Sequence, residues 1–70
     1  MKQTLNIMNC VTEVDVPQFP CECEVTITKG LWSSVSIPQS ITFKSESHMT
    51  NFIKAVIKRG NRVTEIIKQK

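Results

Sequence analysis

The residues best suited to metal chemistry are three cysteines and one histidine, namely Cys10, Cys21, Cys23 and His48. Zinc takes such sulfur and nitrogen ligands in a tetrahedral arrangement, usually from closely paired cysteine knuckles. Cys21 and Cys23 form a C-x-C pair, and in a strand their side chains would share one face about 7 Å apart. That spacing is awkward for one ion, whereas a thiol packs well in a core as a small hydrophobe. We therefore interpret the cysteines as reduced core residues and predict no metal site.

Acid–base or nucleophilic catalysis would need groups held within reach of one another. The acidic residues Glu13, Asp15, Glu22 and Glu24 could supply paired carboxylates, and His48 could supply a base. However, Glu22 and Glu24 alternate with apolar residues, as on the solvated face of a sheet. The sequence identifies no nucleophile beside His48, so we interpret it as a surface histidine.

Phosphate-binding and nucleophile motifs are also missing from the sequence. The only glycines are Gly30 and Gly60, which excludes a G-x-x-x-x-G-K-[ST] or G-x-G-x-x-G loop. No serine, cysteine or threonine stands in a nucleophile elbow. We therefore predict that the protein is not an enzyme and uses no cofactor.

The formal net charge of +3 is unevenly distributed along the chain. Residues 1–43 carry two lysines and four acidic residues, whereas residues 44–70 carry seven basic and two acidic residues. The basic half could attract phosphates or an acidic protein, or it could be a solvated helix face with a basic tail. The single tryptophan, beside a turn, could anchor a partner or cover one end of the core. The candidate binding residues are Trp32, Lys54, Lys58, Arg59 and Arg62.

The clearest predicted element is an amphipathic helix over residues 46–59. Ser45 or Ser47 can cap its first turn, and Gly60 can adopt the left-handed conformation that ends a helix. Phe43, just before the cap, can pack back on the helix. The apolar residues recur at the i, i+3, i+4, i+7 and i+8 positions of one helical stripe, namely Met49, Phe52, Ile53, Val56 and Ile57.

Strands are predicted on both sides of this helix. Residues 4–14 are predicted as one strand with imperfect alternation, and residues 21–29 as a strand with strict alternation. The two prolines within residues 15–20 indicate a connection. Residues 32–37 are predicted as a strand that ends at Pro38 or lies at a sheet edge. Residues 62–68 fit a strand or a helical turn, and we choose the strand because their β-branched residues favour it.

The predicted order is therefore β-β-β-α-β, in one small α+β domain over residues 1–70. Such an order favours a mainly antiparallel sheet with the helix packed across one face. Phe52 and Ile53 are expected to be buried against the apolar face of the second strand, which consists of Cys23, Val25 and Ile27.

The expected location is the cytoplasm. The N-terminal segment alternates polar with apolar residues and lacks the continuous apolar stretch of a signal peptide. No apolar run approaches the roughly 20 residues of a membrane span, so no membrane partner is expected. An odd number of cysteines also suits reduced thiols.

These features favour a small non-enzymatic regulator or inhibitor that binds another protein through charged surfaces, the tryptophan or an open strand edge. The Lys- and Ile-rich composition and small size are typical of proteins encoded by phages or other mobile elements, although no motif supports that origin. The alternative is a nucleic-acid-binding domain that uses the basic helix and C-terminal half. A homodimer, which would enlarge a small core, is a third hypothesis.

Overall fold

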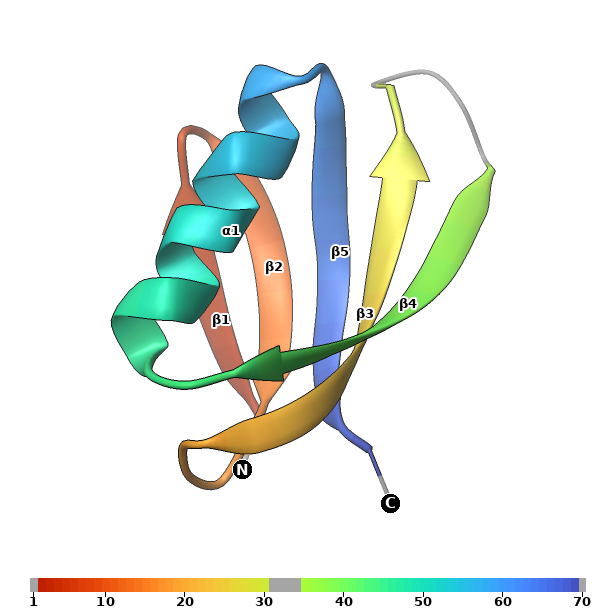
Figure 1. Cartoon of the computed structure of the whole chain (residues 1–70). Helices are drawn as coiled ribbons and strands as arrows, with labels where there is room; N and C mark the ends of the chain where they lie inside the picture. The colour runs from red at the N-terminus through yellow and green to blue at the C-terminus, as the bar shows by residue number, and fades with distance from the viewer. Residues whose placement is uncertain (1, 31–34, 70) are drawn as a thin grey trace.

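A five-stranded sheet with one helix on one face forms the whole of the described structure (Figure 1). The computed structural model describes residues 2–30 and 35–69. The prediction of an α+β fold with one helix on a small sheet is confirmed. The elements in chain order are β1 (Gln3–Ile7), β2 (Cys10–Asp15), β3 (Cys21–Lys29), β4 (Ser36–Phe43), α1 (Glu46–Lys58) and β5 (Asn61–Lys68).

The sheet is mixed, so the predicted pairing needs correction. Its strand order is β1-β2-β5-β3-β4, and β5 pairs parallel to β2 and antiparallel to β3. β2 and β3 run in opposite directions and are separated in the sheet by one strand, β5, which follows α1 in the chain. Since β2 and β3 run in opposite directions, β5 is antiparallel to β3 and parallel to β2. β1 and β4 form the two edges of the sheet.

The prediction of a single strand over residues 4–14 is wrong, because this stretch is the β1–β2 hairpin. The element order is therefore β-β-β-β-α-β rather than the predicted β-β-β-α-β. Met8 and Asn9 form its turn with φ angles of 51° and 66°. A positive φ at both central residues is the geometry that joins two twisted strands through two residues. Leu5 pairs with Thr12 across the hairpin. The turn explains the imperfect alternation, since the chain reverses there.

β3 confirms the predicted strand over residues 21–29, and β4 confirms the alternative that the strand beside Pro38 lies at a sheet edge, although its bounds differ from the prediction. β4 begins at Ser36 and continues through Pro38 to Phe43, beyond the predicted end. Pro38, on the edge strand β4, lies in register with Thr26 of β3. An edge strand has no second neighbour, so the N–H that proline lacks is not needed there for a further hydrogen bond. Residues 32–34 of the predicted strand lie outside the described residues.

The helix ends where its caps predict. Ser45 is the N-cap, and its hydroxyl accepts a hydrogen bond from the His48 N–H at 3.2 Å. At the other end Gly60 has a φ of 87° and donates its N–H to the Ile57 carbonyl at 3.0 Å. Phe43 is fully buried and packs edge-on against Phe52, with ring centroids 5.5 Å apart.

Residues 62–68 form the predicted strand, within β5, and a bulge keeps Val63 and Ile66 on one face. Val63 pairs with Ile27 and Glu65 pairs with Thr26, so Thr64 is the extra residue. Its hydroxyl donates to the Thr26 carbonyl at 3.2 Å. The bulge lets both Val63 and Ile66 face α1, which simple alternation would not allow.

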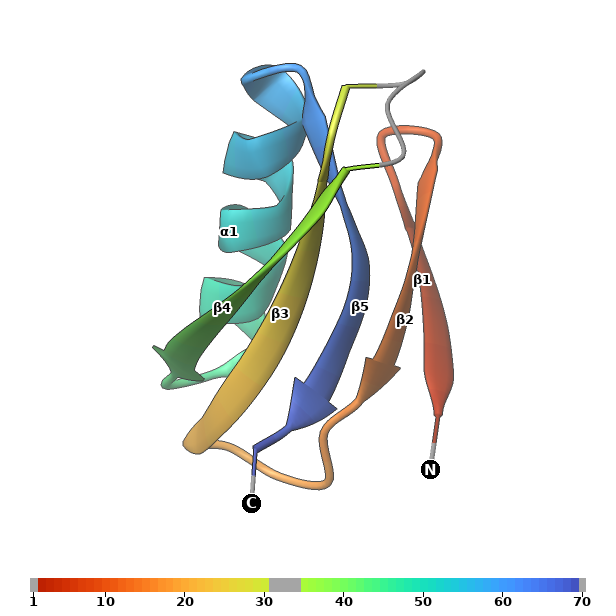
Figure 2. The same ribbon diagram turned by 90° about the vertical axis from the view of Figure 1, so that its right-hand side faces the viewer.

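The core lies between α1 and the sheet, and the opposite sheet face is uncovered (Figure 2). Ile53 is fully buried, as predicted, but Phe52 is only half-buried, so that part of the prediction is wrong. The buried apolar residues are Val14, Cys23, Val25, Ile27, Phe43, Met49, Ile53, Val56, Val63 and Ile66. Within the described ranges, no helix is long and apolar enough to span a bilayer.

Candidate functional site

The four basic candidate residues do not form one surface. Lys54 and Lys58, one helical turn apart, are exposed on α1, and Arg59 follows as the exposed C-cap residue. Arg62 lies on β5 in register with Thr28, on the sheet face opposite α1. The structure thus keeps Lys54 and Lys58 as neighbours on α1, places Arg59 beside a different side of the helix and separates Arg62 from all three.

The remaining candidate, Trp32, lies outside the described residues.

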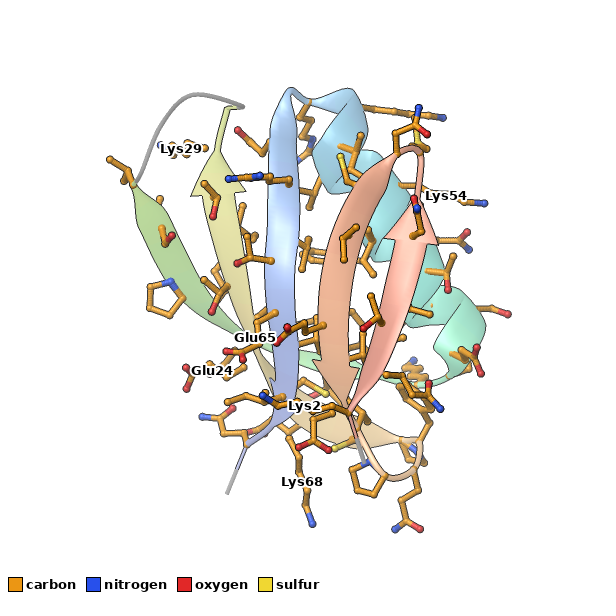
Figure 3. The ribbon with its side chains drawn as sticks, turned by 180° about the vertical axis from the view of Figure 1, so that it is seen from behind. Lys2, Glu24, Lys29, Lys54, Glu65 and Lys68 are labelled. Atoms are coloured by element: carbon orange, nitrogen blue, oxygen red, sulfur yellow. The ribbon has the colours of Figure 1, made fainter. Side chains whose placement is uncertain are left out.

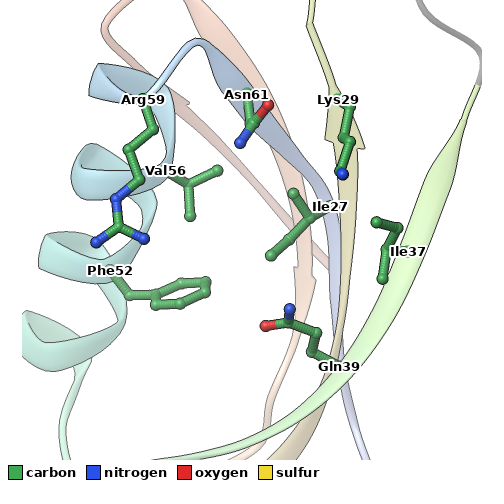
Figure 4. Close-up of a pocket in the computed structure, with 8 residues that line it drawn as sticks. All are labelled: Ile27, Lys29, Ile37, Gln39, Phe52, Val56, Arg59 and Asn61. Carbon is green, nitrogen blue, oxygen red and sulfur yellow. The ribbon is translucent and has the colours of Figure 1, made fainter.

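A groove of about 170 Å³ lies between α1 and the β3–β4 half of the sheet. It exists because the helix lies in front of β1 and β2 and beside β5, whereas the upper parts of β3 and β4 lie beyond β5, away from the helix (Figure 1). Figure 4 shows Phe52 facing Ile27 and Ile37 across the groove. This arrangement also explains why Phe52 is only half-buried. Val56 completes the apolar lining.

Polar side chains border the same groove. Lys29 ends β3 and Arg59 ends α1, so two cations reach the groove from opposite sides (Figure 4). Gln39 and Asn61 contribute amides. Within residues 2–30 and 35–69, none of these four side chains takes part in an ion pair or side-chain hydrogen bond. Their polar groups are therefore available to a ligand.

A second hollow, of about 440 Å³, lies between the β1–β2 turn and the C-terminal end of α1. Among the described residues no charged side chain lines it, and Met8 beside it is half exposed. A surface without charge or convergent polar groups offers little means of selecting a ligand. Its lining residues are Met8, Asn9, Cys10, Ile57, Gly60 and Asn61.

The uncovered sheet face is acidic. Glu13 and Glu65 lie side by side in the parallel β2–β5 pairing, and Glu24 lies in register with Ile67 of β5. Figure 3 shows Glu24 and Glu65 on this face. Lys2 pairs weakly with Glu13 at 3.9 Å. Strand alternation places five carboxylates here, those of Glu13, Asp15, Glu22, Glu24 and Glu65.

His48 has a structural role in this chain. Its Nδ1 accepts a hydrogen bond from the Lys44 N–H at 3.2 Å. Its ring packs edge-on against Phe43 with centroids 5.4 Å apart. These two contacts hold the ring of His48 at the start of α1.

The three thiols are free and differ in burial. Cys23 is fully buried, whereas Cys10 and Cys21 are partly exposed. Burial raises the pKa of Cys23 from 9.0 to about 11, and the neighbouring Cys21 adds to the effect through a hydrogen bond and charge. In the part of the chain that the structure describes, no group of three or more His, Cys, Asp or Glu side chains could hold a metal ion.

Comparison with known proteins gives no relative: no family model, curated protein or solved structure matches this chain.

The sequence left three groove residues unnoticed: Lys29, Gln39 and Asn61. One signal was available for Gln39. It occupies the same strand face as Ile37 and Ile41, so it is a polar residue in an apolar series. A polar residue at such a position indicates that the face is only partly covered. Finding Lys29 and Asn61 required the β3–β5 register, in which they are partners.

Proposed function

We propose that this chain is a small, non-enzymatic protein-binding regulator or inhibitor that acts by occupying a surface of another protein. The observation that carries the proposal is the groove between α1 and the β3–β4 half of the sheet. Its floor is apolar, its border is charged, and it lies beside the sheet edge formed by β4. Apolar contacts at the centre of a patch with polar groups around it are the usual anatomy of a protein interface.

The β4 edge supports the same function. Among the described strands β4 has one neighbour, β3, and β4 is eight residues long. Pro38 has no N–H to donate, so we expect it to occupy a position that points away from β3. Ser40 and Thr42 follow Pro38 at every second position of β4, so their backbone N–H and C=O groups would also point away from β3. An extended segment of a partner could pair with them while its neighbouring residues contact the groove.

The charge distribution favours a protein partner over nucleic acid. Lys54, Lys58 and Arg59 could contact phosphates, but the opposite sheet face carries five carboxylates that repel a polyanion. Arg62 lies on that acidic face rather than with the other three basic residues. A nucleic acid would therefore find only a small basic surface, whereas two faces of opposite charge can orient an approaching protein.

The proposal is tested by affinity capture from a native lysate with nuclease present. The wild-type chain is compared with Ile37→Glu, which places a charge in the groove, and with the matched control Val11→Glu, which replaces an exposed apolar residue of β2 outside the groove. Circular dichroism checks that both variants fold. We expect one protein to be retained by wild type and Val11→Glu and lost by Ile37→Glu.

Two results would contradict the proposal. Equal retention by all three chains would show that the groove is not the binding surface. Binding that disappears on nuclease treatment, and that is lost in a Lys54→Ala/Lys58→Ala variant, would show a nucleic-acid-binding function instead.

A further inference from the structure

We propose that the groove binds an acidic protein segment, in which one apolar side chain is flanked by carboxylates. The apolar side chain enters between α1 and β3–β4, and the carboxylates contact Lys29 and Arg59. This inference rests on the proposed protein-binding function and adds the chemistry of the partner.

The size of the groove favours a side chain over a small-molecule cofactor. Its volume is about 170 Å³, whereas small-molecule sites typically measure about 300–1,000 Å³. In another protein, a cavity of about 150 Å³ lined by aliphatic and aromatic side chains holds one benzene molecule. The groove therefore has room for one leucine-, isoleucine- or phenylalanine-sized group.

The floor of the groove gives that group an apolar contact surface. Phe52 lies on one wall, and Ile27 and Ile37 lie on the other (Figure 4). Phe52 and Ile37 are both half-buried, so part of their apolar surface still meets water. Covering that surface would favour binding, because apolar area would be removed from water.

The two cations select the charge of the partner. Lys29 and Arg59 approach the groove from β3 and α1, and in Figure 4 the Arg59 side chain runs back along the helix above the Phe52 ring. Neither has a carboxylate partner within the described ranges. An arginine can bind a carboxylate through two parallel N–H donors, and a lysine binds it as a point charge. A segment with acidic residues on both sides of its apolar residue would meet both cations.

The amides of Gln39 and Asn61 complete the site. Each offers a carbonyl acceptor and an NH₂ donor. Their side chains make no hydrogen bond within residues 2–30 and 35–69. A peptide backbone that lies along the groove also presents both donors and acceptors, so these amides can satisfy it.

The remainder of the surface helps to orient such a partner. The five carboxylates of the uncovered sheet face repel an acidic segment. An acidic segment is therefore directed to the helix side, where the groove lies. A basic segment would be directed to the opposite face.

The test is an NMR titration of the isotope-labelled full chain with short, terminally blocked peptides. The main probe has a central leucine with glutamates on both sides. A second probe replaces the leucine with alanine, and a third replaces the glutamates with lysines. We expect amide shifts around Lys29, Ile37 and Arg59 with the main probe, and affinity at least about tenfold weaker with either other probe.

Charge-reversed variants make the test specific. The Lys29→Glu/Arg59→Glu variant should bind the main probe with an affinity about tenfold or more below that of wild type, and it should instead bind the lysine-flanked probe. The matched control Lys54→Glu/Lys58→Glu makes the same charge change on α1 outside the groove and should keep its preference for the main probe. Circular dichroism verifies the fold of each variant.

Three results would overturn the inference: shifts centred on Lys54 and Lys58, equal binding of the leucine and alanine probes, or no effect of reversing Lys29 and Arg59. The capture experiment separates this failure from failure of the proposed function. If capture depends on Ile37 but not on Lys29 and Arg59, the groove binds a protein that is not acidic. If capture does not depend on Ile37, the proposed function itself is wrong.

Discussion

The thiol of Cys23 shows how the fold changes the chemistry of a single residue. Burial raises its pKa to about 11, with a smaller effect of Cys21. The folded state therefore keeps this proton at pH values where the unfolded chain, with a pKa near 9.0, releases it. The resulting stabilisation is full below pH 9 and is lost as the pH rises from 9 to 11.

We expect the wild-type free energy of unfolding to fall with rising pH across this interval more steeply than that of Cys23→Ala. The difference should be at most roughly 3 kcal/mol, since one pKa unit is worth about 1.4 kcal/mol. Urea unfolding of both proteins below pH 9 and near pH 11 measures it. Parallel pH profiles would show that the thiol proton is not held by the fold.

Ile53 and Phe52 are neighbours on α1 with different roles, so their truncation should have different costs. Ile53 is fully buried, and Ile53→Ala should cost about 2–5 kcal/mol. Phe52 borders the groove, and Phe52→Ala should cost less than the roughly 3–5 kcal/mol of a buried phenylalanine. Chemical denaturation of the two variants compares these values. A larger loss for Phe52→Ala would show that the ring is a core residue rather than a wall of the groove.

At the scale of elements, the N-terminus of α1 depends on one hydroxyl. Ser45 accepts the His48 N–H, whereas the Ser47 hydroxyl makes no hydrogen bond within the described residues. Ser45→Ala should therefore cost about 0.5–2 kcal/mol, and Ser47→Ala should cost much less. Thermal unfolding of the two variants provides the comparison. Equal costs would mean that the cap is not formed by Ser45.

The sequence of the β1–β2 turn, unlike that of the helix cap, does not suit its geometry. Met8 has a φ of 51°, and a left-handed conformation costs a residue with a long side chain roughly 1–2 kcal/mol. Met8→Asn should relieve part of this cost and raise the melting temperature, because asparagine tolerates that conformation. A lower melting temperature would indicate that the exposed Met8 side chain stabilises the hairpin more than its backbone strains it.

The same turn shows where prediction from sequence stops. Strict alternation gave β3 correctly, and the apolar stripe with its serine and glycine caps gave α1. The hairpin was missed because Met8-Asn9 lacks the usual glycine. The position of β5 between β2 and β3 was missed because it depends on how α1 crosses the sheet. The groove was missed for the same reason, since its residues come from β3, β4, α1 and β5.

At the scale of the whole molecule, the two faces of the sheet differ both in charge and in whether the helix covers them. The uncovered sheet face carries five carboxylates, and the helix side carries the exposed cations Lys54, Lys58 and Arg59. The helix covers one half of its sheet face and leaves the groove over the other half. A partner of the helix side would therefore contact apolar surface and positive charge together, beside the open edge of β4.

Hydrogen exchange of the chain, alone and bound to its captured protein, tests this central claim most directly. The claim predicts slower exchange on binding in β4 and around the end of α1, at residues 36–43 and 58–61, because the partner covers the groove and pairs with the strand edge. Protection confined to the β1–β2 hairpin, with residues 36–43 unchanged, would contradict it.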